Sequence, residues 1–218
     1  MTKAPAIIGL LLAAYFAGSI PFSLLLARAV AGIDIRQHGS GNVGATNVGR
    51  LLGWKWGIAA LILDTLKGLL PTLLLPSLVR DPALGTHVAV GCGLAAIVGH
   101  MFPCWLGFRG GKGIATSLGV VLVLGPWGAL AALGTFAILF ATTRIVSLGS
   151  IAGVTAFAIV QLWLLRPDPF SGATWSLAAF SIAAPLLGIW RHRANIGRLL
   201  RGEEKAFATA SKPAAVPM

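Results

Sequence analysis

Long apolar runs separated by short polar segments dominate this chain. The uncharged or nearly uncharged runs are residues 4–27, 58–75, 82–108, 114–143, 145–165 and 169–190. A helix that crosses a bilayer needs about 20 mainly apolar residues, so most of these runs are long enough. The first run has no charged residue over 24 positions, which favours a membrane span over a cleaved signal peptide. The pattern predicts an all-α integral membrane protein.

The run 114–143 is too long for one straight span. As a helix it would measure about 45 Å, whereas the hydrocarbon core of a bilayer is about 30 Å thick. The sequence Gly125-Pro126-Trp127-Gly128 in its middle would break a helix. We therefore expect two short spans here and about seven transmembrane helices in all. The first of the two, 114–124, would start below the membrane surface or be partly re-entrant.

Lys and Arg are distributed unevenly around these seven spans. One face would carry only Lys3, Arg80 and Arg166. The other would carry thirteen Lys and Arg side chains, in segments 28–55, 104–112, 142–149 and 190–218. Positive charge concentrates in cytoplasmic loops, so we expect the N-terminus outside and the C-terminus in the cytoplasm.

Composition supports the membrane assignment and limits the chemistry. The chain is 56% hydrophobic and 11% charged, whereas soluble domains are about 25% charged. Its net charge of +11 comes from 17 Lys and Arg against 6 Asp and Glu. Because the carboxylates form no cluster, we expect no metal site, which excludes Mg-dependent or two-metal phosphotransfer. The balance favours direct binding of an anion. We assign residues 1–205 to one membrane domain, and the small, polar residues 206–218 to a disordered tail.

The first polar segment, "HGSGNVGATNVGR" at 38–50, has no apolar face, and we expect it to be non-helical. Glycines let backbone N–H groups converge, and Arg50 supplies a planar fork for phosphate or carboxylate. The segment also offers neutral hydrogen-bonding side chains, namely Ser40, Asn42, Thr46 and Asn47. The alternative is a plain connecting loop.

The second polar segment, "GHMFPCWLGFRGGKGIATS" at 99–117, resembles a P-loop but fails its spacing. That motif needs Gly where Leu106 stands and Ser or Thr where Gly113 stands. What remains is a tight turn at Gly111 and Gly113 with the charge of Lys112 at a helix start. We interpret it as a phosphate-binding loop, with a glycine-containing membrane anchor as the alternative.

Two further segments face the same side. In "RIVSLGSIAG" at 144–153, which we also expect to be non-helical, Ser147 and Ser150 are either helix N-caps or substrate contacts. In the basic segment after 190, His192 and Asn195 are three residues apart, on one helical face.

The apolar runs also contain polar residues. Asp64 and Lys67 are three residues apart inside one run, so they either pair within the bundle or serve function. His100 is either a core histidine or a functional one.

Taken together, "GSGNVGATNVGR", "GHMFPCWLGFRGGKGIAT", "SLGSI" and "RHRANIGRLLRGEE" resemble the bacterial acyl-phosphate:glycerol-3-phosphate acyltransferase family. The resemblance runs to about residue 205. It implies a seven-helix enzyme of phospholipid synthesis in the bacterial inner membrane, with its active site facing the cytoplasm. It further implies that acyl phosphate donates a fatty acyl group to sn-glycerol 3-phosphate, giving lysophosphatidic acid. No cofactor, metal or nucleic acid is expected. Membrane lipid surrounds the enzyme, and an acyl-carrier-protein:phosphate acyltransferase would supply the donor.

The resemblance also assigns roles to residues. Ser40, His192 and Asn195 match catalytic positions of the family. Positions that would bind substrate or phosphate are Arg50, Gly111, Lys112, Gly113 and Ser150, with Asn42, Thr46 and Asn47 beside them. Gly149 is a departure, since a serine often stands there.

The chemistry suits these residues, because acyl phosphate is already activated and the enzyme mainly orients two anions. We expect direct attack by the 1-hydroxyl of glycerol 3-phosphate on the acyl carbon. The base is either His192 or the substrate's own phosphate, whose second pKa is about 6, and we favour the phosphate.

Other classes fit less well. No histidine is followed five residues later by Asp, as the H-x-x-x-x-D pattern of acyl-CoA-dependent acyltransferases requires. A CDP-alcohol phosphatidyltransferase needs an Asp-rich metal site. A serine hydrolase using Ser40 and His100 would lack the G-x-S-x-G elbow. A phosphate transporter would need access from both faces.

Overall fold

The computed structural model describes residues 4–208, and these form ten α-helices. Two short 3-10 turns, η1 (Leu75–Leu78) and η2 (Cys104–Leu106), interrupt the connections. The helices are α1 (Ala4–Ser19), α2 (Phe22–Ala31), α3 (Ala45–Leu52), α4 (Trp54–Leu74), α5 (Pro82–Met101), α6 (Ile114–Leu124), α7 (Pro126–Thr143), α8 (Val146–Leu164), α9 (Trp175–Arg191) and α10 (Arg193–Leu200).

Proline and glycine set two helix breaks. Helix α1 ends just before Pro21, because proline cannot donate the hydrogen bond that a continuing helix needs. Gly125 separates α6 from α7, with Pro126 in the first turn of α7. The break predicted in the run 114–143 is therefore confirmed.

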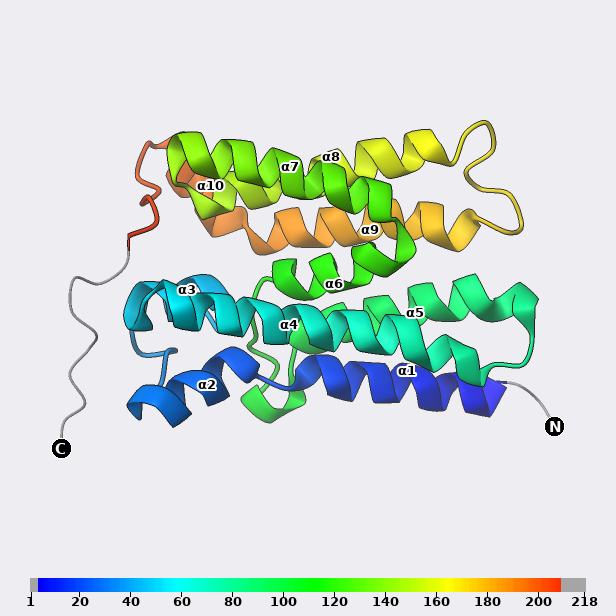
Figure 1. Cartoon of the computed structure of the whole chain (residues 1–218), viewed down its shortest axis with the longest axis horizontal. Coiled ribbons are helices and arrows are strands. Elements are labelled where there is room, and N and C mark those ends of the chain that lie inside the picture. The colour runs from blue at the N-terminus through cyan, green and yellow to red at the C-terminus, as the bar shows by residue number, and fades with distance from the viewer. Residues whose placement is uncertain (1–3, 209–218) are drawn as a thin grey trace.

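The long helices lie along one axis in two layers (Figure 1). One layer contains α1, α4 and α5, the other contains α7, α8 and α9, and α6 lies between them near the middle of the long axis. Small residues allow close backbone approach, as is common between membrane helices. A Cβ atom on Gly18 would overlap the Ala96 backbone of α5, and one on Gly119 of α6 would overlap the Thr65 backbone of α4.

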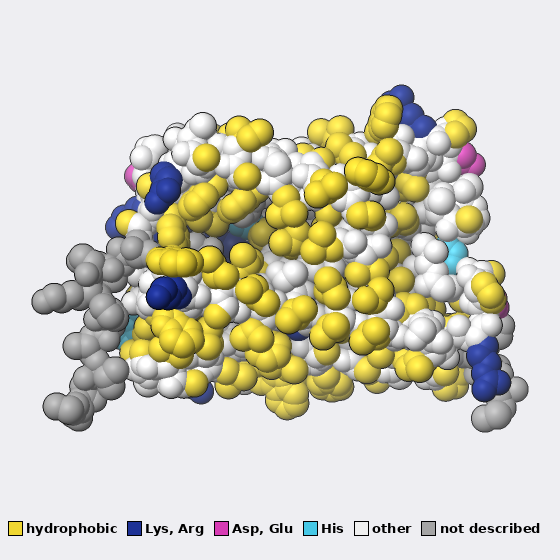
Figure 2. Space-filling model, viewed as in Figure 1, with side chains coloured by type: hydrophobic (Ala, Val, Ile, Leu, Met, Phe, Trp, Pro, Cys, Tyr) yellow, Lys and Arg dark blue, Asp and Glu magenta, His cyan; other side chains and the backbone are white. Residues whose placement is uncertain are grey.

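Five helical segments have the length and hydropathy of membrane spans: Ala4–Ala31, Trp54–Leu78, Pro82–Leu106, Pro126–Thr143 and Val146–Leu164. Two further apolar helices, α6 and α9, are shorter, with 11 and 17 residues. Hydrophobic side chains cover most of the face in Figure 2, whereas Lys and Arg show mainly towards the two ends of the long axis. The chain is thus an all-helical membrane protein.

Two segments that we predicted to be non-helical contain helix. Residues 45–52 form α3, because Val48 is buried and Gly49 lets this short helix approach Gly57 of α4. Helix α8 already starts at Val146, so most of the segment 144–153 is helical. Of the predicted tail, residues 209–218 lie outside the described part, and Phe207 is packed against Phe140 of α7.

Candidate functional site

A cluster of polar side chains joins the second polar segment to α10. The Lys112 Nζ atom lies 2.6 Å from Oδ1 of Asn195, and the Asn195 amide donates to Glu204 Oε1 at 2.6 Å. Glu204 also accepts from Ser147 of α8 and forms an ion pair with Arg198, at 2.7 and 2.6 Å. Three parts of the chain that are distant in sequence therefore converge on one carboxylate and one ammonium group.

The glycine turn before Lys112 is held from two sides. Arg191, the last residue of α9, donates to the carbonyl oxygens of Gly110 and Gly111, in each case at 2.8 Å. On the other side, a Cβ atom on Gly111 would overlap Nε2 of His100 and lie 2.7 Å from the Val43 carbonyl oxygen. Only glycine fits here, and the fit brings the first polar segment against the second.

Hydrogen bonds of the turn change the expectation that Gly111 binds phosphate. The amide of Gly110 donates to the Met101 carbonyl and that of Gly111 to the His100 carbonyl. These two N–H groups therefore stabilise the turn rather than point at a ligand. Gly113 follows with a φ of +84°, which favours glycine and starts α6 just after Lys112. The turn thus presents the Lys112 side chain.

Burial lowers the pKa of Lys112 to about 8, and the nearby Arg198, Arg50 and Arg191 act in the same direction, whereas Glu204 opposes them. The ammonium group is still mainly protonated at neutral pH. So many cations beside one another form a strong site for an anion.

Asn47 organises the first polar segment. Its buried amide donates to the carbonyls of Ile35 and His38, at 2.9 and 3.1 Å, and accepts from the Ser40 amide at 2.9 Å. We predicted a substrate contact for this residue, but its amide is engaged by backbone. Its observed role is to shape the loop that carries Ser40.

Arg50 and Ser40 lie on different sides of this segment. Arg50, in α3, donates to the Lys205 carbonyl at 3.3 Å and is close enough to affect the pKa of Lys112. Thr46 precedes it in the first turn of α3 and is half-buried. Ser40 is exposed at the edge of a pocket.

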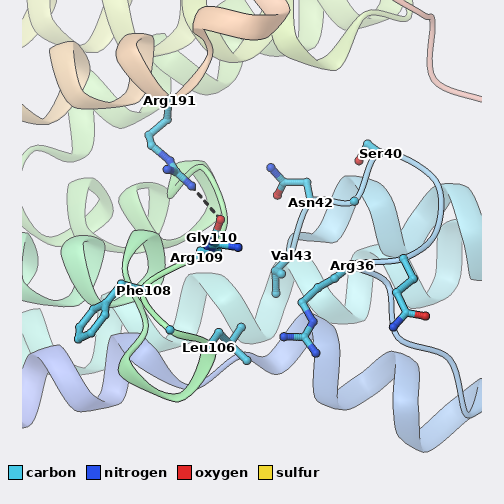
Figure 3. A pocket seen from close by; sticks show the side chains of 12 residues that line it. Arg36, Ser40, Asn42, Val43, Leu106, Phe108, Arg109, Gly110 and Arg191 are labelled. Atoms are coloured by element: carbon cyan, nitrogen blue, oxygen red, sulfur yellow. Dashed lines mark hydrogen bonds between the residues drawn. The ribbon is translucent and has the colours of Figure 1, made fainter.

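That pocket has a volume of about 830 Å³ and lies between the first two polar segments. Figure 3 shows Arg191 reaching from α9 towards Gly110, while Ser40 and Asn42 lie on the facing segment. Its lining combines cationic and apolar side chains, namely Arg36, Arg109, Arg191, Val43, Leu106 and Phe108. Phe108 is 60% exposed, so the pocket has an apolar rim. Such a lining suits an anion with a hydrocarbon tail.

His192 lies at the junction of α9 and α10. Its Nδ1 atom is 2.8 Å from the Gly188 carbonyl oxygen, which can only accept. The neutral ring therefore carries its proton on Nδ1 and leaves Nε2 as an acceptor. Burial and the charge of Lys112 lower the pKa of His192 to about 4. A group with this pKa is a weak base at neutral pH.

The two serines of α8 do not cap the helix. Its N-cap is Ile145, so the N-cap interpretation of Ser147 and Ser150 is wrong. Ser150 is buried and donates to the Val146 carbonyl one turn earlier, at 2.8 Å. Ser147, not Ser150, is the serine of this segment that reaches Glu204.

Sequence reasoning missed two members of the site. Glu204 stands in a polar stretch without apolar periodicity, which gave no sign that its side chain turns inward. Arg191 was counted only as a positive charge at a membrane boundary. Among residues 4–208, no three His, Cys, Asp or Glu side chains form a group that could hold a metal ion.

Comparison with known proteins gives consistent matches over the whole membrane part. A family model described as "Glycerol-3-phosphate acyltransferase" matches residues 8–202. A relative with that name from Anaeromyxobacter sp. (strain Fw109-5) is 48% identical, over 91% of this chain and 96% of the relative. Another, from Myxococcus xanthus, is also 48% identical, over 95% of this chain and 100% of the relative. A crystal structure of PlsY, an integral membrane glycerol 3-phosphate acyltransferase in its glycerol 3-phosphate form, superposes with a TM-score of 0.81. That chain is 39% identical, with 93% of this chain and 96% of that one covered. Its lysophosphatidic acid form gives a TM-score of 0.79 at 38% identity.

Proposed function

The chain belongs to the glycerol-3-phosphate acyltransferase family, and we propose that it transfers a fatty acyl group from acyl phosphate to the 1-hydroxyl of sn-glycerol 3-phosphate. The products are lysophosphatidic acid and inorganic phosphate. One observation carries this proposal: Lys112 contacts Asn195 within the electrostatic influence of Arg50, and the glycine turn just before Lys112 lines a pocket that is both cationic and apolar. A small phosphate and an amphiphilic phosphate have complementary surfaces there.

In the reaction, the 1-hydroxyl oxygen attacks the acyl carbon while the bond from that carbon to the phosphate oxygen breaks. The leaving group departs as inorganic phosphate. Lys112 and Arg50 bind phosphate oxygens, and Asn195 and Ser40 donate or accept hydrogen bonds around the reacting groups. Ser150, Asn42, Thr46 and Asn47 support these groups through the segments that carry them.

The hydroxyl proton passes to the phosphate of glycerol 3-phosphate. The phosphate has a second pKa of about 6, closer to neutrality than the pKa of about 4 that burial imposes on His192. His192 then orients the acceptor through Nε2. No acyl-enzyme forms, because the donor is already a mixed anhydride.

We further propose seven spans, with the N-terminus outside and the cation-rich end in the cytoplasm of a bacterial inner membrane. In this arrangement α6 and α9 complete the set, and residues 1–205 act as one catalytic domain. Soluble glycerol 3-phosphate would reach the site from the cytoplasm. An acyl-carrier-protein:phosphate acyltransferase would supply the donor.

A donor comparison tests the proposal. Purified protein in detergent is incubated with labelled glycerol 3-phosphate and either palmitoyl phosphate or palmitoyl-CoA. We expect lysophosphatidic acid with palmitoyl phosphate alone. Product from palmitoyl-CoA only would overturn the donor assignment, and no product from either would overturn the enzyme assignment.

A further inference from the structure

Four buried polar side chains meet beneath the glycine turn, and we call them the buried polar network: Ser23, Asp64, Lys67 and His100. The side chains of Asp64, Lys67 and His100 are 1%, 3% and 6% exposed. They come from α2, α4 and α5, so the network joins three helices. None of the four belongs to the chemistry described above.

Three contacts of the network are short, and the one to His100 is longer. Lys67 Nζ lies 2.8 Å from Asp64 Oδ1, and Ser23 donates to Asp64 Oδ2 at 2.9 Å. Lys67 also donates to the carbonyl of Ile20 at 2.7 Å, at the break between α1 and α2. His100 Nδ1 is 3.8 Å from Asp64 Oδ1. The ion pair thus holds the helix break at Ile20 and packs against one edge of the His100 ring without a hydrogen bond to it.

The opposite edge of that ring faces the glycine turn. Nε2 of His100 occupies the space that a Cβ atom on Gly111 would need. In addition, the Gly111 amide donates to the His100 carbonyl at 3.2 Å. A displacement of His100 would therefore displace Gly111 and, one residue later, Lys112.

The network also lies next to the substrate pocket. A small internal cavity of about 10 Å³ is lined by Asp64, Lys67, His100 and Gly110. Val43, Leu106 and Gly110 line both this cavity and the larger pocket. The buried polar network is therefore separated from the pocket by one layer of residues.

Charged residues inside a membrane bundle are costly, and apolar residues of similar size often stabilise a fold equally well. We propose that Asp64, Lys67 and His100 are positioning residues for substrate phosphate. The Asp64–Lys67 pair holds the His100 ring against Gly111, and this contact directs Lys112 towards Asn195. The inference deepens the proposed function, on which it rests for the identity of the phosphate bound by Lys112.

The first test uses kinetics. Asp64→Asn/Lys67→Met removes both charges at once, so that neither is left buried alone, and His100→Ala removes the ring. We expect the KM for glycerol 3-phosphate to rise about ten- to a hundredfold, as for a small misplacement of a binding group, with kcat changed less than about threefold. His100→Gln, whose amide reaches towards the place of Nε2, should recover most of the wild-type KM.

The matched control is Gln161→Leu. Gln161 is another buried polar residue, but it lies in α8 against Gly125, where α6 and α7 meet. This variant should keep the wild-type KM even if its melting temperature falls. If folded His100→Ala has a KM for glycerol 3-phosphate within twofold of the wild type, the inference is overturned. If the double variant does not fold, His100→Ala alone decides the test.

A second readout does not require turnover. Without substrate, the rate at which acetic anhydride labels Lys112 is followed by mass spectrometry. We expect labelling at least threefold faster in His100→Ala than in the wild type, because the side chain loses its fixed position, and an unchanged rate at the exposed Lys55. Equal rates at Lys112 would contradict the inference. A wild type without any product would overturn the proposed function and leave this test intact.

Discussion

The Nζ atom of Lys112 lies 2.6 Å from Oδ1 of Asn195, although 83 residues separate them in the chain. The contact connects the glycine turn before α6 to the short helix α10. It also places the ammonium group within the influence of Arg50 and Arg198. The cations of three polar segments therefore act on one volume.

Replacing Lys112 tests whether this volume binds phosphate. Lys112→Met removes the charge-assisted hydrogen bond, a contribution of about 1.5–3 kcal/mol, so KM for glycerol 3-phosphate should rise by about ten- to a hundredfold. Steady-state kinetics with palmitoyl phosphate as donor measure the change. Lys55→Met, which alters an exposed lysine of α4, is the matched control and should behave like the wild type. Equal KM values for the two variants would exclude Lys112 from phosphate binding.

The protonation of Lys112 predicts a pH dependence. Burial lowers its pKa from 10.5 to about 8, so the side chain is charged below this pH and neutral above it. The profile of kcat/KM for glycerol 3-phosphate should rise as the substrate phosphate loses its second proton near pH 6, be level between about pH 7 and 8, and then fall about tenfold per pH unit as Lys112 loses its charge. The profile is measured from pH 6 to 10 with correction for spontaneous hydrolysis of the donor. A level profile up to pH 10 would speak against a lysine that loses its charge near pH 8.

Asn47 should matter for loop structure. Asn47→Ala removes three hydrogen bonds to buried or half-buried backbone groups, each contributing about 1 kcal/mol. We expect a lower melting temperature together with a loss of activity, because the Ser40 loop is no longer held. The comparison is Asn42→Ala in the same segment, which should leave the melting temperature within about 2 °C. The assignment fails if Asn47→Ala melts like the wild type.

His192→Gln separates the two candidate bases. Because the pKa of His192 is about 4, we expect the variant to retain at least about a tenth of kcat, with the substrate phosphate taking the proton. A general base would be worth about a hundred- to ten-thousandfold, so a loss of that size would assign the proton to His192. His87→Gln, at a histidine of α5 that hydrogen bonds to Ser176, serves as the control.

Much of the architecture could be predicted because each membrane-spanning helix requires a long apolar run in the sequence. The break at Gly125 was predicted from Gly and Pro and is confirmed. Helical spacing left Asp64 and Lys67 either paired or functional, and the structure shows the ion pair. Helix α3 was not predicted because its apolar face is short, with Val48 buried and Leu51 and Leu52 packed beside it, and because the close approach of Gly49 to Gly57 cannot be read from residue type. Such contacts depend on which helices become neighbours.

The sequence indicated which segments form the candidate site, but not how their individual side chains are arranged. Residue type indicated that Asn47 and Ser150 can hydrogen bond, but not that the amide of Asn47 and the hydroxyl of Ser150 donate to nearby backbone carbonyls. Glu204 could not be found because its burial results from the path of the chain after α10. Charge counting identified the cation-rich end, whereas the direction of each side chain required the folded structure.

The most direct test follows the phosphate group of the donor. Purified protein is given palmitoyl [³²P]phosphate and unlabelled glycerol 3-phosphate, and inorganic phosphate and lysophosphatidic acid are quantified together. We predict one labelled inorganic phosphate for each lysophosphatidic acid, with no label in the lipid product. Label in the lipid would indicate phosphoryl transfer, and labelled phosphate without lysophosphatidic acid would indicate hydrolysis; either result would contradict acyl transfer at this site.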